Sequence, residues 1–184
     1  TIQTFQGFVY HMTCRGSRFK DGAMRNPAGQ VFMKGRESSE WLAQNLRSTR
    51  NFIRKWGHMV NHDQFLKPIV PPKYDIGFVV ENCDYNMLNE LEPWCSKIYV
   101  DTYAQDYIDR EQSNTLYDLN DRIFSIDVDV QNDVEVRFDG SKLTNESFQY
   151  IQQLPEILAN DKLEVGSFEL DIFEISINKI KTYE

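Results

Sequence analysis

The sequence predicts an α/β (or α+β) fold: a small mixed sheet with β-α-β units, preceded by an N-terminal strand-loop-helix segment. Two apolar stretches support this prediction. Residues 76–80 (I-G-F-V-V) form a continuous apolar run, as expected for a strand that is buried on both faces. A helical pattern separates this run from a second strand-like run at residues 97–101. The order strand, helix, strand implies a parallel pair of strands. The 184 residues, 41% of them hydrophobic, suffice for one ordinary domain or two small ones.

The N-terminal part predicts a strand, a loop and a helix. Residues 5–11 (F-Q-G-F-V-Y-H) predict the strand, and residues 18–30 predict the loop because Gly, Asn and Pro are frequent there. Residues 39–56 predict a helix that ends at Gly57. Its approximate apolar side consists of Trp41, Leu42, Leu46, Phe52, Ile53 and Trp56. Another side carries Arg47, Arg50 and Arg54 at helical spacing.

Beyond residue 80, predicted helices and strands alternate. Asp84 is a candidate cap for a helix whose apolar residues continue to Cys95. Residues 168–177 alternate like one long strand, but the apolar phase shifts within them, which indicates a bulge or a bend. The other predicted elements are a helix near 103–111, a strand at 133–139 and a helix at 144–158 that contains Pro155.

The charge divides the chain into two predicted parts. Residues 68–74 contain three prolines, which neither a helix nor a central strand accommodates, and they mark a boundary. Before it, the basic segment 1–73 has 12 basic and 4 acidic residues; after it, the acidic α/β domain 74–184 has 8 basic and 24 acidic residues. Either the basic segment faces an anionic partner, or the two parts attract each other across an internal interface.

The composition narrows the class of protein. Three cysteines (Cys14, Cys83 and Cys95) with no C-x-x-C pair indicate reduced thiols in a cytoplasmic protein rather than a disulfide framework or a zinc ribbon. No apolar run approaches the roughly 20 residues of a membrane helix, so no membrane span is expected. The arginine side of residues 39–56 could contact phosphate, but the chain is acidic and has no recognition motif, so no nucleic-acid partner is expected.

Basic and hydroxyl side chains follow His11 at the end of the first predicted strand. Strand ends that open into loops are where α/β proteins place ligand-binding groups. Imidazole is a common ligand for a divalent metal, and guanidinium groups chelate phosphate oxygens. His11 is therefore a candidate metal ligand, and Arg15, Ser17 and Arg18 are candidate diphosphate-binding residues. The alternative is a solvated loop beside a histidine that is bonded to a neighbouring backbone group.

Two further groups could hold a metal ion. His58 and His62 have the i, i+4 spacing of two ligands on one helix face. However, Gly57 precedes them and no third ligand has a recognisable spacing, which favours a surface pair. Asp127 and Asp129 follow an apolar stretch, and an Asp-x-Asp after a strand can share a hard cation with phosphate oxygens. Chance matches to this short motif are frequent in so acidic a segment.

Three polar residues, Glu81, Asn82 and Asp101, follow the two predicted parallel strands. They stand at the carboxyl edge, where open α/β sheets bind their ligands. No Gly-rich phosphate loop follows either strand, and neither a G-x-S-x-G motif nor a nucleophilic Cys-His arrangement is visible. A small complete enzyme would use this edge of the sheet.

Two segments resemble a known enzyme family. The strand F-V-Y-H-M-T with the Arg/Ser-rich loop behind it, and the helix end N-F-I-R-K-W-G, are similar to the C-terminal end of inverting, GT-A-type glycosyltransferases of family two. In that family, the histidine lies beside the metal and the nucleotide diphosphate, and the loop closes over the donor. The resemblance covers about residues 5–60. The matching residues are Tyr10, His11, Gly16, Ser17, Lys55, Trp56 and Gly57.

The resemblance implies that His11 contacts the metal or the diphosphate, that Arg15 and Arg18 clamp phosphate, and that Trp56 packs. The parent enzyme would use Mn²⁺ or Mg²⁺ and a nucleotide-sugar donor, whereas no cofactor is firmly expected for this chain. Residues 19–38 are a longer insertion than the family pattern has. In the family, the nucleotide-binding strands, the Asp-x-Asp and the catalytic base precede the histidine. No catalytic residue is therefore assigned here, and the chain is expected to be a truncated product that is inactive alone.

Three hypotheses follow. The first is the C-terminal portion of a nucleotide-sugar-dependent glycosyltransferase, with a donor-diphosphate closing loop and an appended α/β domain. The second is a non-catalytic interaction domain whose basic and acidic faces mediate assembly. The apolar surface of the basic segment would be hidden either by packing on the acidic domain or by a homodimer. The third is a small complete enzyme at the sheet edge near Glu81 and Asp101.

Overall fold

The computed structural model describes residues 2–3, 8–9, 39–159 and 164–179, and the chain divides into two units, Thr1–Leu46 and Arg47–Glu184. The smaller unit contains two short antiparallel strands and the first turns of a helix that continues into the larger unit. These elements are β1 (Ile2–Gln3), β2 (Phe8–Val9) and α1 (Ser39–Trp56). The predicted division at residue 73 follows charge, whereas these units follow contacts and divide between Leu46 and Arg47.

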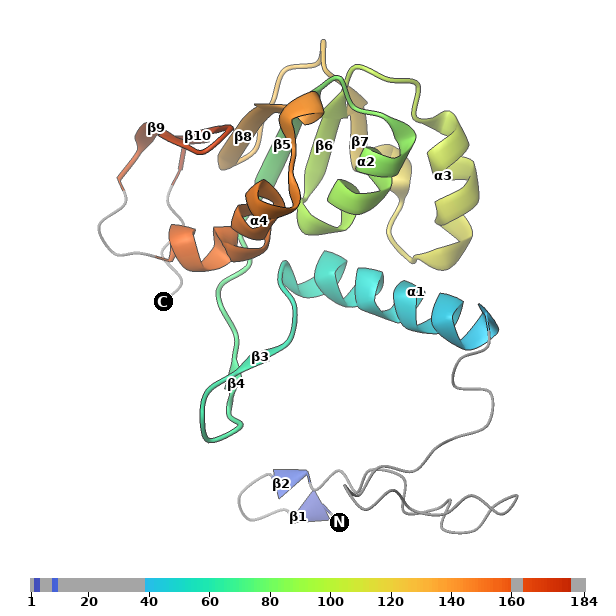
Figure 1. Ribbon diagram of the computed structural model, residues 1–184, viewed down its shortest axis with the longest axis vertical. Coiled ribbons are helices and arrows are strands. Elements are labelled where there is room, and N and C mark those ends of the chain that lie inside the picture. Colours follow the sequence, from blue (N-terminus) through green and yellow to red (C-terminus); the bar gives the residue numbers. More distant parts are fainter. Residues whose placement is uncertain (1, 4–7, 10–38, 160–163, 180–184) are drawn as a thin grey trace. The chain divides into compact units, whose positions relative to one another are not determined.

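A six-stranded mixed sheet with the order β7-β6-β5-β8-β10-β9 forms the centre of the larger unit (Figure 1). Its strands are β5 (Ile76–Glu81), β6 (Lys97–Val100), β7 (Ile123–Ser125), β8 (Val134–Asp139), β9 (Gly166–Leu170) and β10 (Phe173–Ile177). Strands β7, β6, β5 and β8 are parallel, and β10 is antiparallel to both of its neighbours. The structure thus confirms the α/β fold with a small mixed sheet and β-α-β units.

Helices cover one face of this sheet (Figure 1). They are α2 (Tyr85–Leu91), α3 (Gln105–Glu111) and α4 (Asn145–Leu158). Asp84 caps α2 as predicted, because its carboxylate accepts a hydrogen bond from the Met87 amide at 2.8 Å. The helix ends earlier than expected, since Pro93 lies in a following 3₁₀ turn. The 3₁₀ turns are η3 (Glu92–Trp94), η4 (Gln112–Asn114), η5 (Leu119–Asp121) and η6 (Gly140–Lys142).

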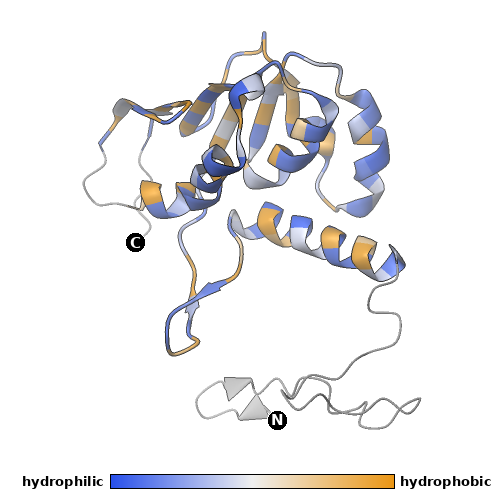
Figure 2. Cartoon of the chain, viewed as in Figure 1, coloured by the Kyte–Doolittle hydropathy of each residue, from blue (hydrophilic) through white to orange (hydrophobic). Residues whose placement is uncertain are grey.

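The core lies between the helices and the sheet, where hydrophobic residues gather along the strands (Figure 2). Alternate residues of β5, such as Phe78 and Val80, are fully buried there. The other face is partly covered by the connection from β7 to β8, in which Asn132 accepts a hydrogen bond from the Tyr99 hydroxyl at 3.1 Å. A Cβ atom at position 77 would collide with this asparagine, so the close approach requires Gly77.

The predicted long strand at 168–177 is in fact two strands, which corrects the expected bulge. Leu170 pairs with Phe173, and the two residues between them form the hairpin turn, with Asp171 in the left-handed region at φ 55°. The apolar phase shifts because the chain reverses, not because a strand bends. After the reversal, the buried side chains of β10 are Phe173, Ile175 and Ile177.

A short hairpin joins α1 to the sheet. It pairs β3 (Asn61–His62) with β4 (Pro68–Ile69), so the proline-rich segment at 68–74 lies inside the larger unit. The Asp63 carboxylate accepts hydrogen bonds from the amides of Phe65 and Lys67, at 2.8 and 2.9 Å, and so fixes the turn. No helix among the described residues is long and apolar enough to cross a membrane.

Candidate functional site

Helix α1 turns Arg50 and Arg54 inward, which corrects the predicted apolar side. Arg50, Ile53 and Arg54 are its buried residues. Four of the six predicted apolar residues are instead exposed, and Figure 2 shows hydrophobic positions recurring along this helix. These four residues, with their exposed fractions, are Trp41 (38%), Leu42 (55%), Leu46 (60%) and Trp56 (41%). Burial of arginine requires paired charges, so the acidic part of the chain has to supply carboxylates.

The first of these carboxylates is Glu92, which is fully buried at the start of η3. Arg54 reaches it with Nη2 at 2.6 Å from Oε2, and Arg122 reaches it with Nε at 2.7 Å from Oε1. The Tyr107 hydroxyl donates a third hydrogen bond, at 3.0 Å. We name the whole group the arginine–glutamate cluster. Its members are Arg50, Arg54, Glu92, Tyr107, Glu111 and Arg122.

The second carboxylate, Glu111, comes from the end of α3. Its Oε1 accepts hydrogen bonds from Arg50 Nε at 2.8 Å and from Arg54 Nη2 at 2.6 Å. Helix α1 is therefore tied to α3 and to the turn after α2 by charge-assisted hydrogen bonds. Of the two interpretations of the charge asymmetry, these contacts support mutual attraction for Arg50 and Arg54, which are not free to bind an external phosphate.

The cluster controls the ionisation of its members. Burial alone would raise the pKa of Glu92, but the hydrogen bond from Arg54 and the charge of Arg122 outweigh burial and lower it. The pKa of Glu111 is lowered in the same way by Arg54 and Arg50. For Tyr107, burial and the charge of Glu92 both raise the pKa, so the phenol stays protonated and donates. Both glutamates are thus held as carboxylates.

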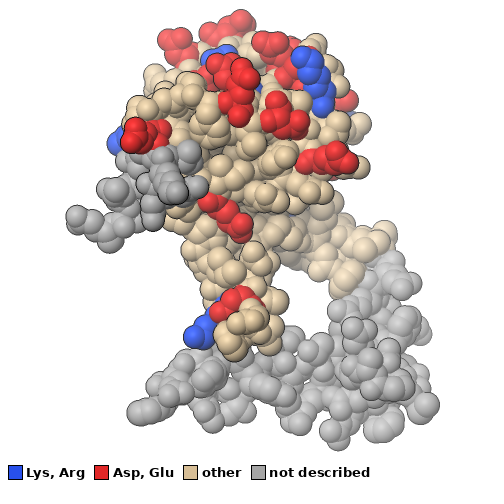
Figure 3. Space-filling model, turned by 60° about the vertical axis from the view of Figure 1, so that its left-hand side comes forward, with Lys and Arg blue, Asp and Glu red and all other residues tan. Residues whose placement is uncertain are grey.

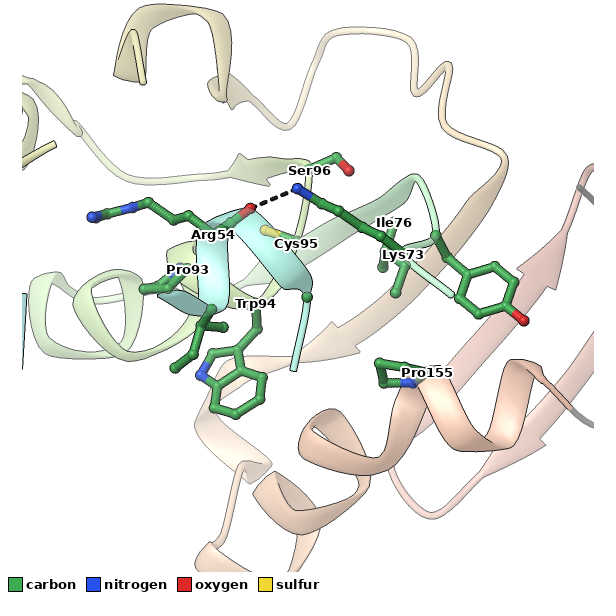
Figure 4. Close-up of a pocket in the computed structure, with 11 residues that line it drawn as sticks. Arg54, Lys73, Ile76, Pro93, Trp94, Cys95, Ser96 and Pro155 are labelled. Atoms are coloured by element: carbon green, nitrogen blue, oxygen red, sulfur yellow. Dashed lines mark hydrogen bonds between the residues drawn. The ribbon is translucent and has the colours of Figure 1, made fainter. Parts of the chain in front are cut away.

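Two contacts fix the end of α1. Gly57 adopts the left-handed conformation at φ 79°, which stops the helix as predicted. Lys73 then donates from Nζ to the carbonyl oxygen of Arg54 at 2.6 Å (Figure 4). Burial, and then the charge of Arg122, lower the pKa of this lysine. The pocket drawn around these residues, with Trp94 and Pro155 on its wall, measures only about 10 Å³, so it has room for no more than a water molecule.

The predicted loop residues lie outside the described part of the chain. These are His11, Arg15, Ser17 and Arg18. The residues that sequence reasoning missed are Glu92, Glu111 and Arg122. One signal was present in the sequence. Glu92 interrupts the apolar pattern that leads from Leu91 to Trp94, and a charged side chain among buried residues requires an oppositely charged partner.

At the carboxyl edge of the sheet, the polar side chains form hydrogen bonds with one another and with nearby backbone amides. Both oxygens of Asp101 accept from backbone amides of the turn after β5, from Asn82 at 2.6 Å and Cys83 at 3.0 Å. The Asn82 side chain donates to Asp139 at 2.9 Å. Hydrogen bonds from Ser141 and then Asn82 lower the pKa of Asp139 to about 2. These carboxylates position turns, while Glu81 is exposed at the strand end.

The two predicted metal pairs are not assembled into sites. His58 is buried, and its Nδ1 donates to the carbonyl of Met59 at 2.7 Å, whereas His62 is exposed in β3. The pair is therefore not a surface pair, because only one member reaches solvent. Asp127 and Asp129 are both exposed beyond β7. Within the described ranges, no three His, Cys, Asp or Glu side chains are grouped so that they could hold a metal.

The described cysteines do not offer a nucleophile. Burial and then the charge of Asp101 raise the pKa of Cys83 to about 12, and burial raises the pKa of Cys95. Both thiols are therefore protonated near neutral pH, and a thiolate is the form that attacks. The geometry of the described site is that of an anchor for α1.

Glu92→Gln should destabilise the larger unit by about 3–5 kcal/mol, because it leaves buried arginines without their counter-charge. Urea unfolding followed by circular dichroism measures this loss. Glu90→Gln is the matched control two residues away on the exposed side of α2, with an expected change below about 0.5 kcal/mol. Equal stability of both variants would refute the role of the cluster.

Acid should unfold this unit. Both glutamates have folded-state pKa values below the ordinary 4.5, so their stabilisation is complete above that pH and is lost as the pH falls through the folded values. Thermal unfolding between pH 7 and pH 3 measures the decline. Glu111→Gln should decline less steeply than the wild type, and an equal slope would count against this assignment.

No family model, no curated protein and no solved structure matches this chain.

Proposed function

We propose that the chain is the C-terminal part of a nucleotide-sugar-dependent glycosyltransferase, in which the larger unit anchors the helix that follows a donor-closing loop. The observation that carries the proposal is the docking of α1 through the arginine–glutamate cluster. The cluster holds the last turns of the helix, directly before the K-W-G ending that resembles the family.

The anchor has a mechanical reason in this proposal. A loop that closes over a donor has to exchange between open and closed positions, and it does so best from a fixed attachment. Arg54 is fully buried, Gly57 stops the helix and Lys73 donates to the Arg54 carbonyl, so the C-terminal end of α1 is fixed in three ways. The predicted loop residues precede this helix in the sequence.

The reaction of the whole enzyme would be displacement at the anomeric carbon by an acceptor hydroxyl. Arg15, Ser17 and Arg18 would bind the departing diphosphate, because guanidinium groups bind phosphate oxygens in pairs. The base that takes the acceptor proton would come from the part that precedes His11 in the family. Carried over by resemblance, His11 would lie beside the divalent metal, Mn²⁺ or Mg²⁺.

The proposal can be tested by saturation-transfer NMR of the full chain. The ligands are uridine, guanosine and thymidine diphosphate, in a buffer that contains Mg²⁺ and no Mn²⁺. We expect signal transfer to at least one nucleoside diphosphate, and a loss in the Arg15→Ala/Arg18→Ala variant. Each lost charge-assisted hydrogen bond should weaken binding roughly tenfold. Lys67→Ala, an exposed lysine in the β3–β4 turn, is the matched control. Unchanged transfer in the Arg15→Ala/Arg18→Ala variant, or an equal loss in Lys67→Ala, would contradict the proposal.

A second candidate function, an assembly domain that forms homodimers, rests on the β3–β4 hairpin. Six large apolar side chains are exposed within twelve residues there, and such a patch marks an interaction surface. Their exposed fractions run from 41% to 75%: Met59, Val60, Phe65, Leu66, Ile69 and Val70. The tip residue Leu66 adopts the left-handed conformation at φ 60°, and its side chain is exposed.

Light scattering after size-exclusion chromatography tests this second function. The full chain should form dimers at high concentration, and Phe65→Ser/Leu66→Ser should shift it to monomers. Leu116→Ser removes an even more exposed leucine elsewhere and should leave the dimer intact. A chain that is monomeric at every concentration would exclude this function.

A further inference from the structure

An open pocket lies between α1 and the segment that runs from η4 toward η5. Its volume of about 430 Å³ is within the range of small-molecule sites. We name it the Arg47–Lys55 pocket. The residues that line it are Arg47, Asn51, Lys55, Ser113, Asn114, Thr115, Leu116 and Tyr117.

Hydrogen bonds fix the two walls of this pocket to each other. Asn51 on α1 donates to the carbonyl of Asn114 at 2.7 Å, and Asn114 in turn donates to Glu111 Oε2 at 3.1 Å. The amide of Tyr117 donates to the Thr115 hydroxyl at 3.2 Å. The pocket therefore adjoins the arginine–glutamate cluster and is formed before any ligand arrives, which lowers the entropic cost of binding.

The charge of the pocket is opposite to that of its surroundings. Carboxylates are spread over the surface of the larger unit, as Figure 3 shows for one face. The pocket nevertheless has two cationic side chains and no acidic one. Arg47, Asn51 and Lys55 stand at i, i+4 and i+8, so they follow one side of α1 over about 12 Å.

The two cations of the pocket differ from the buried arginines of the same helix. Arg50 and Arg54 are neutralised by glutamates, whereas Arg47 and Lys55 are exposed and form no ion pair with any described residue. Lys55 Nζ lies over the Trp56 ring, 4.9 Å from its centroid, so an anion that enters the pocket meets positive charge that no carboxylate of the described residues neutralises. A carboxylate would satisfy one of these side chains, whereas a phosphate group has enough acceptor oxygens for both.

The opposite wall suits an uncharged group. Leu116 is fully exposed there, beside the amide of Asn114 and the hydroxyl of Ser113. The ring of Tyr117 is held in place by the Arg122 guanidinium, 5.4 Å from its centroid. An apolar edge combined with amide and hydroxyl groups is the surface that a sugar or a nucleoside ring contacts.

We propose that the Arg47–Lys55 pocket binds an organic phosphate, with the phosphate group between Arg47 and Lys55 and its sugar or nucleoside against Leu116 and Tyr117. The site needs no metal ion. It uses none of the residues assigned to the donor-closing loop, so it can be tested separately from the glycosyltransferase proposal.

Amide chemical-shift titration of the full chain, in buffer with a chelator and no divalent metal, tests this site. The probes are inorganic phosphate, glucose 6-phosphate, uridine monophosphate and glucose. We expect shifts at residues 113–117 with a phosphate ester, and tighter binding of that ester than of inorganic phosphate. The sugar phosphate and the nucleotide distinguish the two sources of the ester. Arg47→Gln/Lys55→Gln should weaken binding at least tenfold.

Lys142→Gln is the control, because this exposed lysine lies in η6, away from the pocket. It should bind the ester as the wild type does. Three results would overturn the proposal: no shifts at 113–117 with any phosphate, equal affinity for the esters and for inorganic phosphate or glucose, or unchanged affinity in the double variant. Nucleoside diphosphate binding that is lost in the Arg15/Arg18 variant reports on the loop instead, so the two proposals fail independently.

Discussion

The buried carboxylate of Glu92 determines how helix α1 joins the sheet-bearing unit. Two arginines of the helix and one from the segment before β7 converge on it, and its side chain is fully buried. Such a group adds little net stability compared with an apolar core, since each charge loses its hydration. What it adds is selection of one orientation of the helix: rotating α1 by a quarter turn about its axis would leave Arg50 and Arg54 without their glutamate partners.

The elements with strong local signals could be predicted from the sequence. Helix α1, strand β5 and the Asp84 cap follow directly from spacing, apolar runs and side-chain chemistry. The β9–β10 turn was missed because Asp171 and the isoleucine after it lack the Asn-Gly or Gly-rich signature of short hairpins. Which side of α1 faces the core was missed for another reason. Glu92, the partner of the buried Arg54, is 38 residues away in the sequence, and no local pattern indicates this contact.

Four basic residues on one helix therefore have two different roles. Arg50 and Arg54 are structural, because glutamates of the same chain neutralise them. Arg47 and Lys55 flank them and are exposed. Spacing alone places Arg47, Arg50 and Arg54 on one side of the helix, so the sequence could not separate the two anchoring arginines from the exposed one. Only the tertiary positions of Glu92 and Glu111 make that distinction.

The position of β5 in the sheet has a consequence for the order of folding. It is the first strand of the sheet in the sequence, yet it lies in the middle, with β6 on one side and β8 on the other. During synthesis, β5 can pair with β6, as Gly77 does with Lys97, soon after both strands leave the ribosome. The pairing of β5 with β8, as of Ile76 with Val134, forms only after the longer segment between them has been made. Until then the sheet has a vacant hydrogen-bonding edge at its centre, and the closure of that longer loop costs more entropy.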